Sequence, residues 1–351
     1  MHVMWPRPRS GVASATLLIA ALCATSCTTG SANDAAITPP PPQQQRPPTP
    51  APPPPPPAPE SVRANELGDV PVLMYHRITD APESVYDRTP ADFRAELERL
   101  AAEGYVPVTV SEYAAGRFDI PAGTHPVVLT FDDGSVTQFT LDGSGRPAPG
   151  TAVNILLEVA AAHPGFRPVA TFYVFNPPFE EPTGARGLKW LHDNGFEIGN
   201  HTVDHPNLGQ VSGAQAQQQI AGMQRVITDA VPGLVVRSLA LPLGVHPDDE
   251  KLAADGSADG VTYHHDSVML VGSNPAPSPW SADFDPANIP RVRSQGPGGQ
   301  DAAYGSTAWL DKLAADPDRR YTSDGDPNRV SAPGSVSEQP NAAAQARAYR
   351  Y

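Results

Sequence analysis

The strongest constraint on the fold of this chain is an alternation between short apolar runs and longer segments with helical periodicity, which begins at Val70. The apolar runs predict strands at residues 70–75, 106–110, 126–131, 169–175, 196–199 and 235–240. Apolar residues at helical spacing predict helices at residues 90–103, 151–163, 187–194 and 211–230. Strands that alternate with helices form parallel sheets, so we expect an α/β fold whose sheet is either closed into a barrel or left open.

The N-terminus has the composition of an export signal. Arg7 and Arg9 precede an apolar run at residues 11–24 that is too short to span a bilayer comfortably, so residues 1–27 are expected to be a signal peptide. The run ends in small residues before Cys27, which resembles the lipobox of bacterial lipoproteins. We therefore expect an exported protein held on the outer side of the cell membrane by a lipid at Cys27, with full secretion as the alternative.

Two further segments depart from the alternating pattern. Residues 28–66 are rich in proline, including the unbroken run 52–57, and are expected to be a disordered spacer. After residue 295 the pattern fades, apart from a predicted helix at residues 305–315. Residues 296–351 are therefore expected to be a largely disordered extension, which leaves residues 67–295 as the folded domain.

Charge and cysteine content narrow the chemistry. The formal net charge of −14 argues against a nucleic-acid partner, because phosphate binding requires a basic surface. Both cysteines, Cys23 and Cys27, lie in the predicted signal segment. The folded domain therefore has no disulfide and no thiolate, and any metal in it must be held by nitrogen and oxygen atoms.

Two acidic residues end the predicted strand 126–131. In Thr130-Phe131-Asp132-Asp133-Gly134 both carboxylates lie at the carboxyl end of the sheet, where parallel α/β folds build their sites. Neighbouring side chains of an extended chain point in different directions, so one aspartate can bind a metal while the other faces a water molecule. Taken alone, this sequence is also a common turn.

Two histidines follow the predicted strand 196–199. His201 and His205 are spaced so that both imidazoles can reach one cation, and imidazole suits zinc and similar ions. A buried structural histidine beside a surface one is the alternative for such a pair. Together with Asp132 and Asp133 at another strand end, the pair favours a metal site with open coordination positions.

These two motifs, in this order, resemble those of the polysaccharide deacetylases of carbohydrate esterase family four, T-F-D-D-G and H-[ST]-x-x-H-P. Both are complete here, at residues 130–134 and 201–206, and the resemblance extends over residues 70–293. It implies a distorted, incomplete (β/α) barrel of parallel strands in a single catalytic domain. It also implies a metal-dependent hydrolase that removes N-acetyl groups.

The resemblance assigns a role to each matching residue. Asp132 is implied to be the general base, and Asp133, His201 and His205 the ligands of a divalent metal. Zinc is the expected metal, with cobalt or nickel as alternatives, because imidazole and carboxylate accept several ions.

The third family motif, R-x-P-[YF]-G, is altered. Ala240 occupies the position of the arginine that orients the base, and Leu243 replaces the aromatic residue. The Pro-Gly turn remains, so the backbone N–H of Leu243 is expected to stabilise the oxyanion. Arg291 is the candidate to substitute for the missing arginine.

The general acid is assigned from a second resemblance. The segment 72–78, with His76, looks like the opening of the poly-N-acetylglucosamine deacetylase branch, where the corresponding histidine is the acid. A hydrogen-bonded structural role is the alternative for His76, and His264 and His265 are rival acids in a predicted Gly-, Asp- and Ser-rich loop.

We therefore expect a monomeric enzyme that deacetylates an N-acetylglucosamine-containing polysaccharide of the cell wall or the extracellular space. Two alternatives remain. Because the arginine is missing at Ala240, one is a catalytically impaired homologue that binds glycan or metal. The other keeps the chemistry but changes the substrate, as an esterase that removes O-acetyl groups from glycans.

Overall fold

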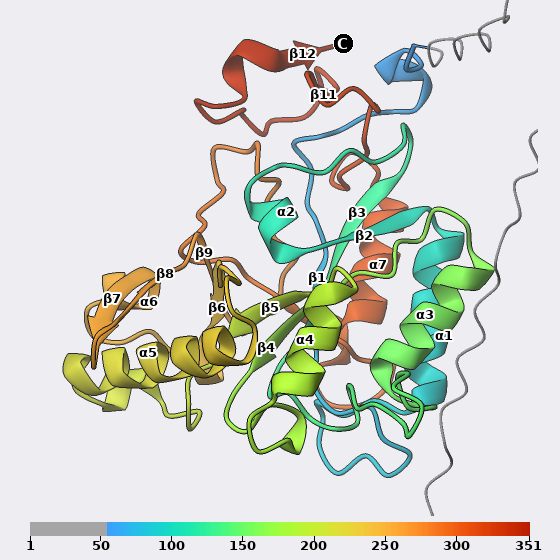
Figure 1. Cartoon of the computed structure of the whole chain (residues 1–351). Helices are drawn as coiled ribbons and strands as arrows, with labels where there is room; N and C mark the ends of the chain where they lie inside the picture. Colours follow the sequence, from blue (N-terminus) through green and yellow to red (C-terminus); the bar gives the residue numbers. More distant parts are fainter. Residues whose placement is uncertain (1–54) are drawn as a thin grey trace, which may run out of the picture. The chain divides into compact units, whose positions relative to one another are not determined.

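The computed structural model describes residues 55–351 (Figure 1). The chain divides into two units, residues 1–53 and residues 54–351, and the fold below is that of the second unit. The predicted signal peptide, the predicted lipidation site at Cys27 and most of the predicted spacer lie outside the described residues. Among the described helices, none is both long and apolar enough to cross a membrane.

The centre of the fold is a parallel sheet. Its eight strands are β1 (Val72–Tyr75), β2 (Tyr105–Val108), β3 (His125–Phe131), β4 (Thr171–Val174), β5 (Glu197–Asn200), β6 (Ser238–Ala240), β9 (Ser267–Met269) and β10 (Val292–Arg293). They run in the order β10-β1-β3-β4-β5-β6-β9, with β2 beside the first half of β3. Met269 and Ile289 form a parallel bridge that draws the two edges of the sheet together. The predicted α/β fold with a distorted, incomplete barrel is confirmed.

Helices cover the outer face of this sheet, as the periodicity predicts. They are α1 (Pro90–Ala102), α3 (Ala152–Ala162), α4 (Ala185–Asp193) and α5 (Gly213–Ala230). The short helix α2 (Val110–Ala114) was not predicted, and its buried side chains cluster with Val72, Val128 and Tyr173, at alternate strand positions. Each of α1, α3 and α5 begins where a Thr or Ser side chain accepts a hydrogen bond from a backbone N–H of the first turn, at Thr89, Thr151 and Ser212. Figure 1 shows α1 and α3 side by side against the sheet.

Aromatic rings from neighbouring strands connect the core. The ring of Phe131 in β3 stacks on Tyr75 in β1 at 5.0 Å and on Phe172 in β4 at 4.8 Å. All three side chains are fully buried. Such stacked rings add to the stabilisation from buried area and hold three strands in register, so the residues at the carboxyl ends of these strands have a rigid support.

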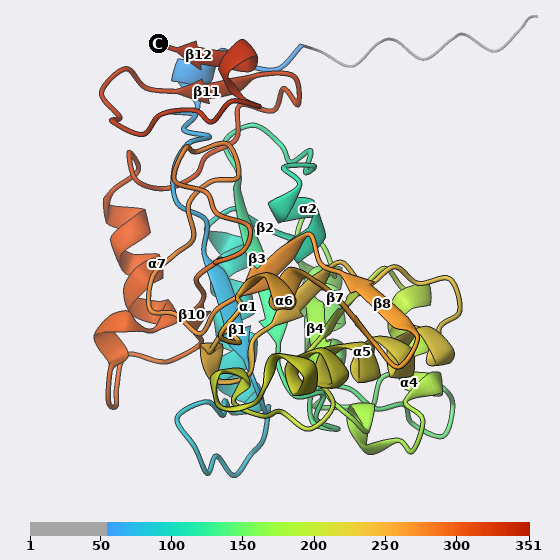
Figure 2. The same ribbon diagram turned by 90° about the vertical axis from the view of Figure 1, so that its left-hand side faces the viewer.

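Residues 255–264 form a hairpin where the sequence predicted a loop. Strands β7 (Asp255–Ala258) and β8 (Val261–His264) pair antiparallel and lie on α5, after the short helix α6 (Lys251–Ala254) (Figure 2). The turn residues Asp259 and Gly260 both have positive φ, as a two-residue hairpin turn requires. This Asp-Gly pair was the sequence signal for the hairpin.

The two segments predicted to be disordered are ordered where they are described. A short 3-10 helix spans Pro59–Ser61, and Asn65 pairs with Thr322 of the C-terminal segment. The predicted helix at residues 305–315 is present as α7 (Ser306–Ala315). Strands β11 (Val330–Ala332) and β12 (Ala348–Arg350) pair with each other beside the segment before β1 (Figure 1). Low apolar content predicted disorder, but Val330, Ala332 and Ala344 are buried in a cluster with Leu67, and polar contacts between distant segments add to this apolar burial.

A buried carboxyl group connects these segments. Glu66 accepts hydrogen bonds from the backbone N–H of Ser331, at 2.8 Å, and from the hydroxyl of Tyr321, at 3.3 Å. Burial raises the pKa of Glu66 to about 8, and the neighbouring Asp324, which pairs with Arg329, adds to this effect. The folded protein therefore retains a proton on Glu66 at pH values where the unfolded chain has lost it.

This difference predicts a pH-dependent stability. The folded pKa of about 8 lies above the ordinary value of 4.5, so the contribution of Glu66 is fully present below about pH 4.5 and is lost as pH rises to about 8. As pH rises from about 4.5 to about 8, we expect the loss of this contribution to lower the free energy of unfolding by up to about 1.4 kcal/mol per pH unit. Urea unfolding at several pH values should show a flatter profile for Glu66→Gln, whereas the exposed control Glu60→Gln keeps the wild-type slope. Equal slopes in all three proteins would contradict this assignment.

Candidate active site

The predicted site residues converge at the carboxyl ends of the parallel strands. Asp132 and Asp133 follow β3, His201 follows β5, and His76 follows β1. A pocket of about 220 Å³ is lined by these four residues together with Tyr86, His205, Leu241, Leu243 and Val271. Motifs that are far apart in the sequence therefore meet in one pocket, as strand-end placement predicts.

Three side chains in this pocket present metal-binding atoms to one another. Oδ1 of Asp133 lies 3.6 Å from Nε2 of His201 and 3.9 Å from Nε2 of His205. One ligand atom from each residue lies within 4.8 Å of those of the other two. Two imidazoles and one carboxylate leave coordination positions open for water and substrate, which is the donor set of catalytic zinc sites.

The orientation of His201 is set by a neighbouring strand. Its Nδ1 lies 2.8 Å from the carbonyl oxygen of Ala240, so this nitrogen carries the proton and donates it. The lone pair of Nε2 is then directed toward Asp133. Burial alone would lower the pKa of His201, but the negative charges of Asp132 and Asp133 raise it above its usual value. Surroundings that stabilise a proton at this position also favour a metal cation.

The backbone around the pocket adopts conformations that L-residues rarely occupy. Asp133, Thr202, His205 and Leu243 have φ angles of 78°, 66°, 53° and 58°. Positive φ at non-glycine residues costs on the order of 1 kcal/mol or more each, and such residues cluster at functional sites. These strained backbone conformations direct a carboxylate, an imidazole and a backbone N–H into one pocket.

Arg291 contacts Asp132, as predicted for a residue that substitutes for the arginine absent at Ala240. Its guanidinium binds Asp132 through two hydrogen bonds, of 2.6 and 2.7 Å, and both side chains are buried. A third contact, from Nε to the carbonyl oxygen of Leu270 at 2.8 Å, holds the guanidinium in place. Arg291 directly precedes β10, whereas Ala240 ends β6, so the arginine reaches Asp132 from a different strand of the sheet.

This pairing determines the charge state of Asp132. Burial alone would raise its pKa, but Arg291, with His201 and His76, outweighs burial and holds the pKa of Asp132 below its usual range. The carboxylate is therefore ionised at neutral pH, as a general base must be. The same pairing makes it a weaker proton acceptor, so it needs an acidified water molecule as its partner.

Leu243 lies at the rim of the pocket in the short helix Pro242–Gly244 that follows β6. Its side chain is 59% exposed, and its backbone has the left-handed conformation. Among the described residues, no acceptor takes a hydrogen bond from its N–H. The N–H is therefore available to a ligand, as expected for an oxyanion donor.

His76 enters the same pocket from the end of β1. Its ring lies 4.8 Å from the ring of Tyr86, and its buried Nδ1 has no hydrogen-bond partner among the described residues. Burial lowers the pKa of His76, against the opposing attraction of Asp132 and Asp133. The structure thus places His76 in the pocket beside Asp132, and its acid role stays a prediction.

The rival histidines lie elsewhere. His264, on the β7–β8 hairpin, contacts Asp255 with Nδ1 at 2.5 Å and is largely exposed. His265 is buried, and its Nδ1 contacts the carbonyl oxygen of Ala253 at 2.8 Å. Neither residue lines the pocket that contains His201, so the structure separates both from the candidate site.

Sequence patterns missed two residues of the site. The buried Gln138 donates from Nε2 to the carbonyl oxygens of His76, at 3.0 Å, and of Asp132, and so joins the segments that carry the acid and the base. Tyr86 forms one wall of the pocket from the loop between β1 and α1. Neither residue lies in a strand-end motif, and their roles depend on contacts across the fold.

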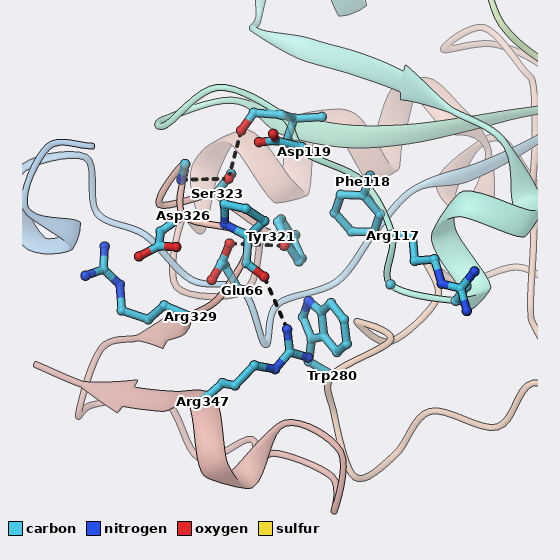
Figure 3. Close-up of a pocket in the computed structure, with 15 residues that line it drawn as sticks. Glu66, Arg117, Phe118, Asp119, Trp280, Tyr321, Ser323, Asp326, Arg329 and Arg347 are labelled. Carbon is cyan, nitrogen blue, oxygen red and sulfur yellow. Dashed lines mark hydrogen bonds between the residues drawn. The ribbon is translucent and has the colours of Figure 1, made fainter. Parts of the chain in front are cut away.

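A larger hollow, of about 430 Å³, lies apart from these residues (Figure 3). Phe118, Trp280, Tyr321, Arg329 and Arg347 line it together with Glu66, and none of the seven predicted site residues does. Arg347 lies over the ring of Trp280 at 4.3 Å, and Arg329 pairs with Asp324. The aromatic and charged side chains that line this hollow therefore contact one another or their neighbours.

Comparison with known proteins shows what part of the chain is similar to. The sequence model of the polysaccharide deacetylase family matches residues 119–261, which include Asp132, Asp133, His201 and His205. These residues form a polysaccharide deacetylase domain. A second model, described as a polyglycine hydrolase-like structural repeat, matches residues 79–118, before the first metal-site motif. The family resemblance seen in the sequence is thereby confirmed.

Curated relatives match part of the chain. A chitooligosaccharide deacetylase of Sinorhizobium fredii is 30% identical over 127 residues, 36% of this chain and 51% of the relative. A peptidoglycan-N-acetylglucosamine deacetylase of Bacillus cereus is 24% identical over 159 residues, 45% of this chain and 51% of the relative. The chain thus spans about half the length of these curated relatives.

Two solved structures superimpose on the chain in part. The deacetylase PplD of Streptococcus pyogenes, in complex with acetate, has a TM-score of 0.49 at 19% identity, over 65% of this chain and 92% of that one. IcaB from Ammonifex degensii has a TM-score of 0.48 at 19% identity, over 70% of this chain and 96% of that one.

Proposed function

We propose that this protein removes N-acetyl groups from a glycan that contains N-acetylglucosamine, with a divalent metal, zinc first and cobalt or nickel next, at Asp133, His201 and His205. The observation that carries the proposal is the convergence of these ligands with an ionised Asp132 in one pocket. The names of the curated relatives support the substrate class. The opening segment around His76 favours a polymer of N-acetylglucosamine over other glycans.

Each residue of the pocket has a task in amide hydrolysis. A divalent cation held by Asp133, His201 and His205 would acidify a water molecule and polarise the acetamide carbonyl. Asp132, oriented by Arg291, takes the proton of the attacking water. The N–H of Leu243 donates a hydrogen bond to the oxyanion of the tetrahedral intermediate. His76 gives a proton to the departing amine, because an unprotonated amine is a poor leaving group.

The pairing of Arg291 with Asp132 supports an active enzyme over an impaired homologue. The missing arginine at Ala240 was the reason to consider impairment, and its contact with the base is made from another strand. The family arginine would keep the base ionised and oriented, and Arg291 gives Asp132 both properties.

Acetate release tests the proposal. Purified protein is incubated with N-acetylglucosamine oligomers and with O-acetylated glycans, and free acetate is measured. Release from the N-acetylated oligomers supports the N-deacetylase. Release only from the esters supports the O-acetyl esterase, and glycan binding without any release supports the impaired homologue.

His76→Ala is expected to lower acetate release by about 10²-fold or more, because the departing amine loses its proton donor. Metal content should stay at the wild-type level, since His76 is separate from the three ligands. The matched control is His192→Ala, an exposed histidine on α4, which should keep full turnover. Turnover of the His76 variant equal to that of the control would remove His76 from the acid role.

Export is part of the same proposal. The Pro-rich spacer after Cys27 would let a lipid-anchored domain extend from the membrane toward the cell wall. Incorporation of a labelled fatty acid into wild type but not into Cys27→Ala would support the anchor, and release of both proteins into the medium would favour secretion.

A further inference from the structure

The predicted general acid, His76, is held mainly through its backbone. Among the described residues, the imidazole of His76 forms no hydrogen bond, and its buried Nδ1 has no partner. The ring of Tyr86, 4.8 Å away, is its aromatic neighbour. A proton donor must lie within hydrogen-bond reach of the atom that it protonates. The placement of this imidazole in the pocket therefore depends on the contacts that fix the main chain at His76.

The pairing of the sheet ends one residue before His76. The last pair of residues between β1 and β3 is Tyr75 with Phe131. The last backbone bond at this end joins the N–H of Asp132 to the carbonyl oxygen of Tyr75, at 2.9 Å. The carbonyl oxygen of His76 therefore needs a hydrogen-bond donor from outside the sheet.

Gln138 supplies that donor. Its Nε2 lies 3.0 Å from the carbonyl oxygen of His76 and also donates to the carbonyl oxygen of Asp132. Carbonyl oxygens only accept hydrogen bonds, so this end of the amide is the NH₂ group, which has two hydrogens to donate. The side chain of Gln138 is fully buried. It thus joins the main chain of the predicted acid to the main chain of the predicted base.

The turn that carries Gln138 is fixed by further contacts. The carbonyl oxygen of Gln138 accepts the N–H of Val153, in the first turn of α3, at 3.1 Å. The hydroxyl of Thr137, the preceding residue, accepts the N–H of Ile78 at 3.1 Å. Two neighbouring side chains of this turn therefore hold the short segment that follows β1.

We propose that Gln138 is a positioning residue for His76, and that it determines how well the site cleaves an amide relative to an ester. This inference rests on the proposed function. In amide cleavage the C–N bond breaks, its electron pair stays on nitrogen, and a proton from the imidazolium of His76 forms a new N–H bond, which leaves a neutral imidazole. An aryl ester needs no such proton, because an aryloxide is a weakly basic leaving group. Displacement of the imidazole therefore slows amide cleavage more than ester cleavage.

The contact of Gln138 with Asp132 has a different consequence. Asp132 takes the proton of the attacking water in both reactions, so a disturbed base lowers amide and ester turnover together. Its carboxylate is also held by two hydrogen bonds from Arg291, of 2.6 and 2.7 Å, whereas the imidazole of His76 has no such support. The ratio of amide to ester turnover therefore reports on the acid, because effects common to both reactions cancel.

Gln138→Met tests this role, because methionine has a similar length and offers no N–H donor. With metal-loaded protein, kcat and KM are measured for acetate release from an N-acetylglucosamine oligomer and for hydrolysis of para-nitrophenyl acetate. We expect the amide-to-ester ratio of kcat to fall about tenfold or more, with the KM for the oligomer unchanged. Gln218→Met, at an exposed glutamine on α5, is the matched control and should keep the wild-type ratio.

The same substitution in a His76→Ala protein separates positioning from general structural support. Without the acid, Gln138→Met should no longer change the ratio, whereas additive losses would show that Gln138 acts by another route. Thr137→Val removes the contact with the N–H of Ile78 and should lower the ratio in the same direction. It carries the test if Gln138→Met does not fold.

A wild-type ratio in folded Gln138→Met protein would overturn the inference. If wild type releases no acetate from the oligomer, the proposed function fails, and crystal structures of wild type and Gln138→Met then test the positioning directly. Displacement of the His76 ring from its place beside Tyr86 would support the inference, and an unmoved ring would overturn it.

Discussion

Replacing Asp132 by asparagine is expected to lower acetate release by about 10²- to 10⁴-fold while the metal content stays unchanged. The amide keeps the shape of the carboxylate but cannot accept the proton of the attacking water. Asp132 is not one of the three side chains whose ligand atoms converge, so the cation site stays complete. The readout is acetate release from N-acetylglucosamine oligomers, with metal content measured on the same samples.

Asp132→Asn should also destabilise the protein, and this loss of stability must be distinguished from the loss of catalytic activity. Arg291 is fully buried, and asparagine leaves its guanidinium without an ionised partner. Breaking a buried ion pair on one side costs about 3–5 kcal/mol, so the assays belong well below the melting temperature of the variant. Asp193→Asn, on the exposed face of α4, is the matched control and should behave as wild type. A folded, metal-loaded Asp132→Asn protein with wild-type turnover would show that another group is the base.

Replacing His201 by alanine is expected to remove both the metal and the activity. The change deletes a ligand whose orientation the carbonyl oxygen of Ala240 fixes, and leaves only two donors to the cation. Outer hydrogen bonds to metal ligands are already worth 10- to 100-fold in affinity, and we expect loss of the ligand itself to cost about 10²-fold or more. Metal content after dialysis, together with acetate release, gives the measurement.

His264→Ala is the matched control for His201. It also removes an imidazole that is close to aspartate, but one on the exposed hairpin away from the pocket. Metal content and turnover should both remain at the wild-type level. Equal metal content in the two variants would mean that the cation is held elsewhere.

The residues at strand ends could be predicted from the sequence because their placement depends on local pattern. An apolar strand that stops at Asp132, and another that stops before His201, bring both to one edge of a parallel sheet whatever the details of packing. Arg291 could also be named from the sequence, because the predicted base needs a positively charged partner and the usual arginine is absent at Ala240. Its geometry could not be predicted, because it depends on β10 lying beside β1.

The rest of the site and fold depends on contacts between distant segments. Tyr86 lines the pocket because the pairing of Arg77 with Asp87 fixes its loop, and no periodic pattern marks such a loop. The C-terminal segment is ordered because buried polar groups such as Glu66 receive hydrogen bonds from Ser331 and Tyr321. Composition counts apolar area and gives no weight to such bonds, so it predicted disorder for residues 296–351.

The most direct test of a metal-dependent deacetylase is acetate release from N-acetylglucosamine oligomers by protein that has been stripped of metal with a chelator and then resupplied with zinc. The account predicts that stripping abolishes release and that zinc, or to a lesser degree cobalt or nickel, restores it in wild type but not in His201→Ala. Undiminished release from the stripped wild-type protein would contradict the account.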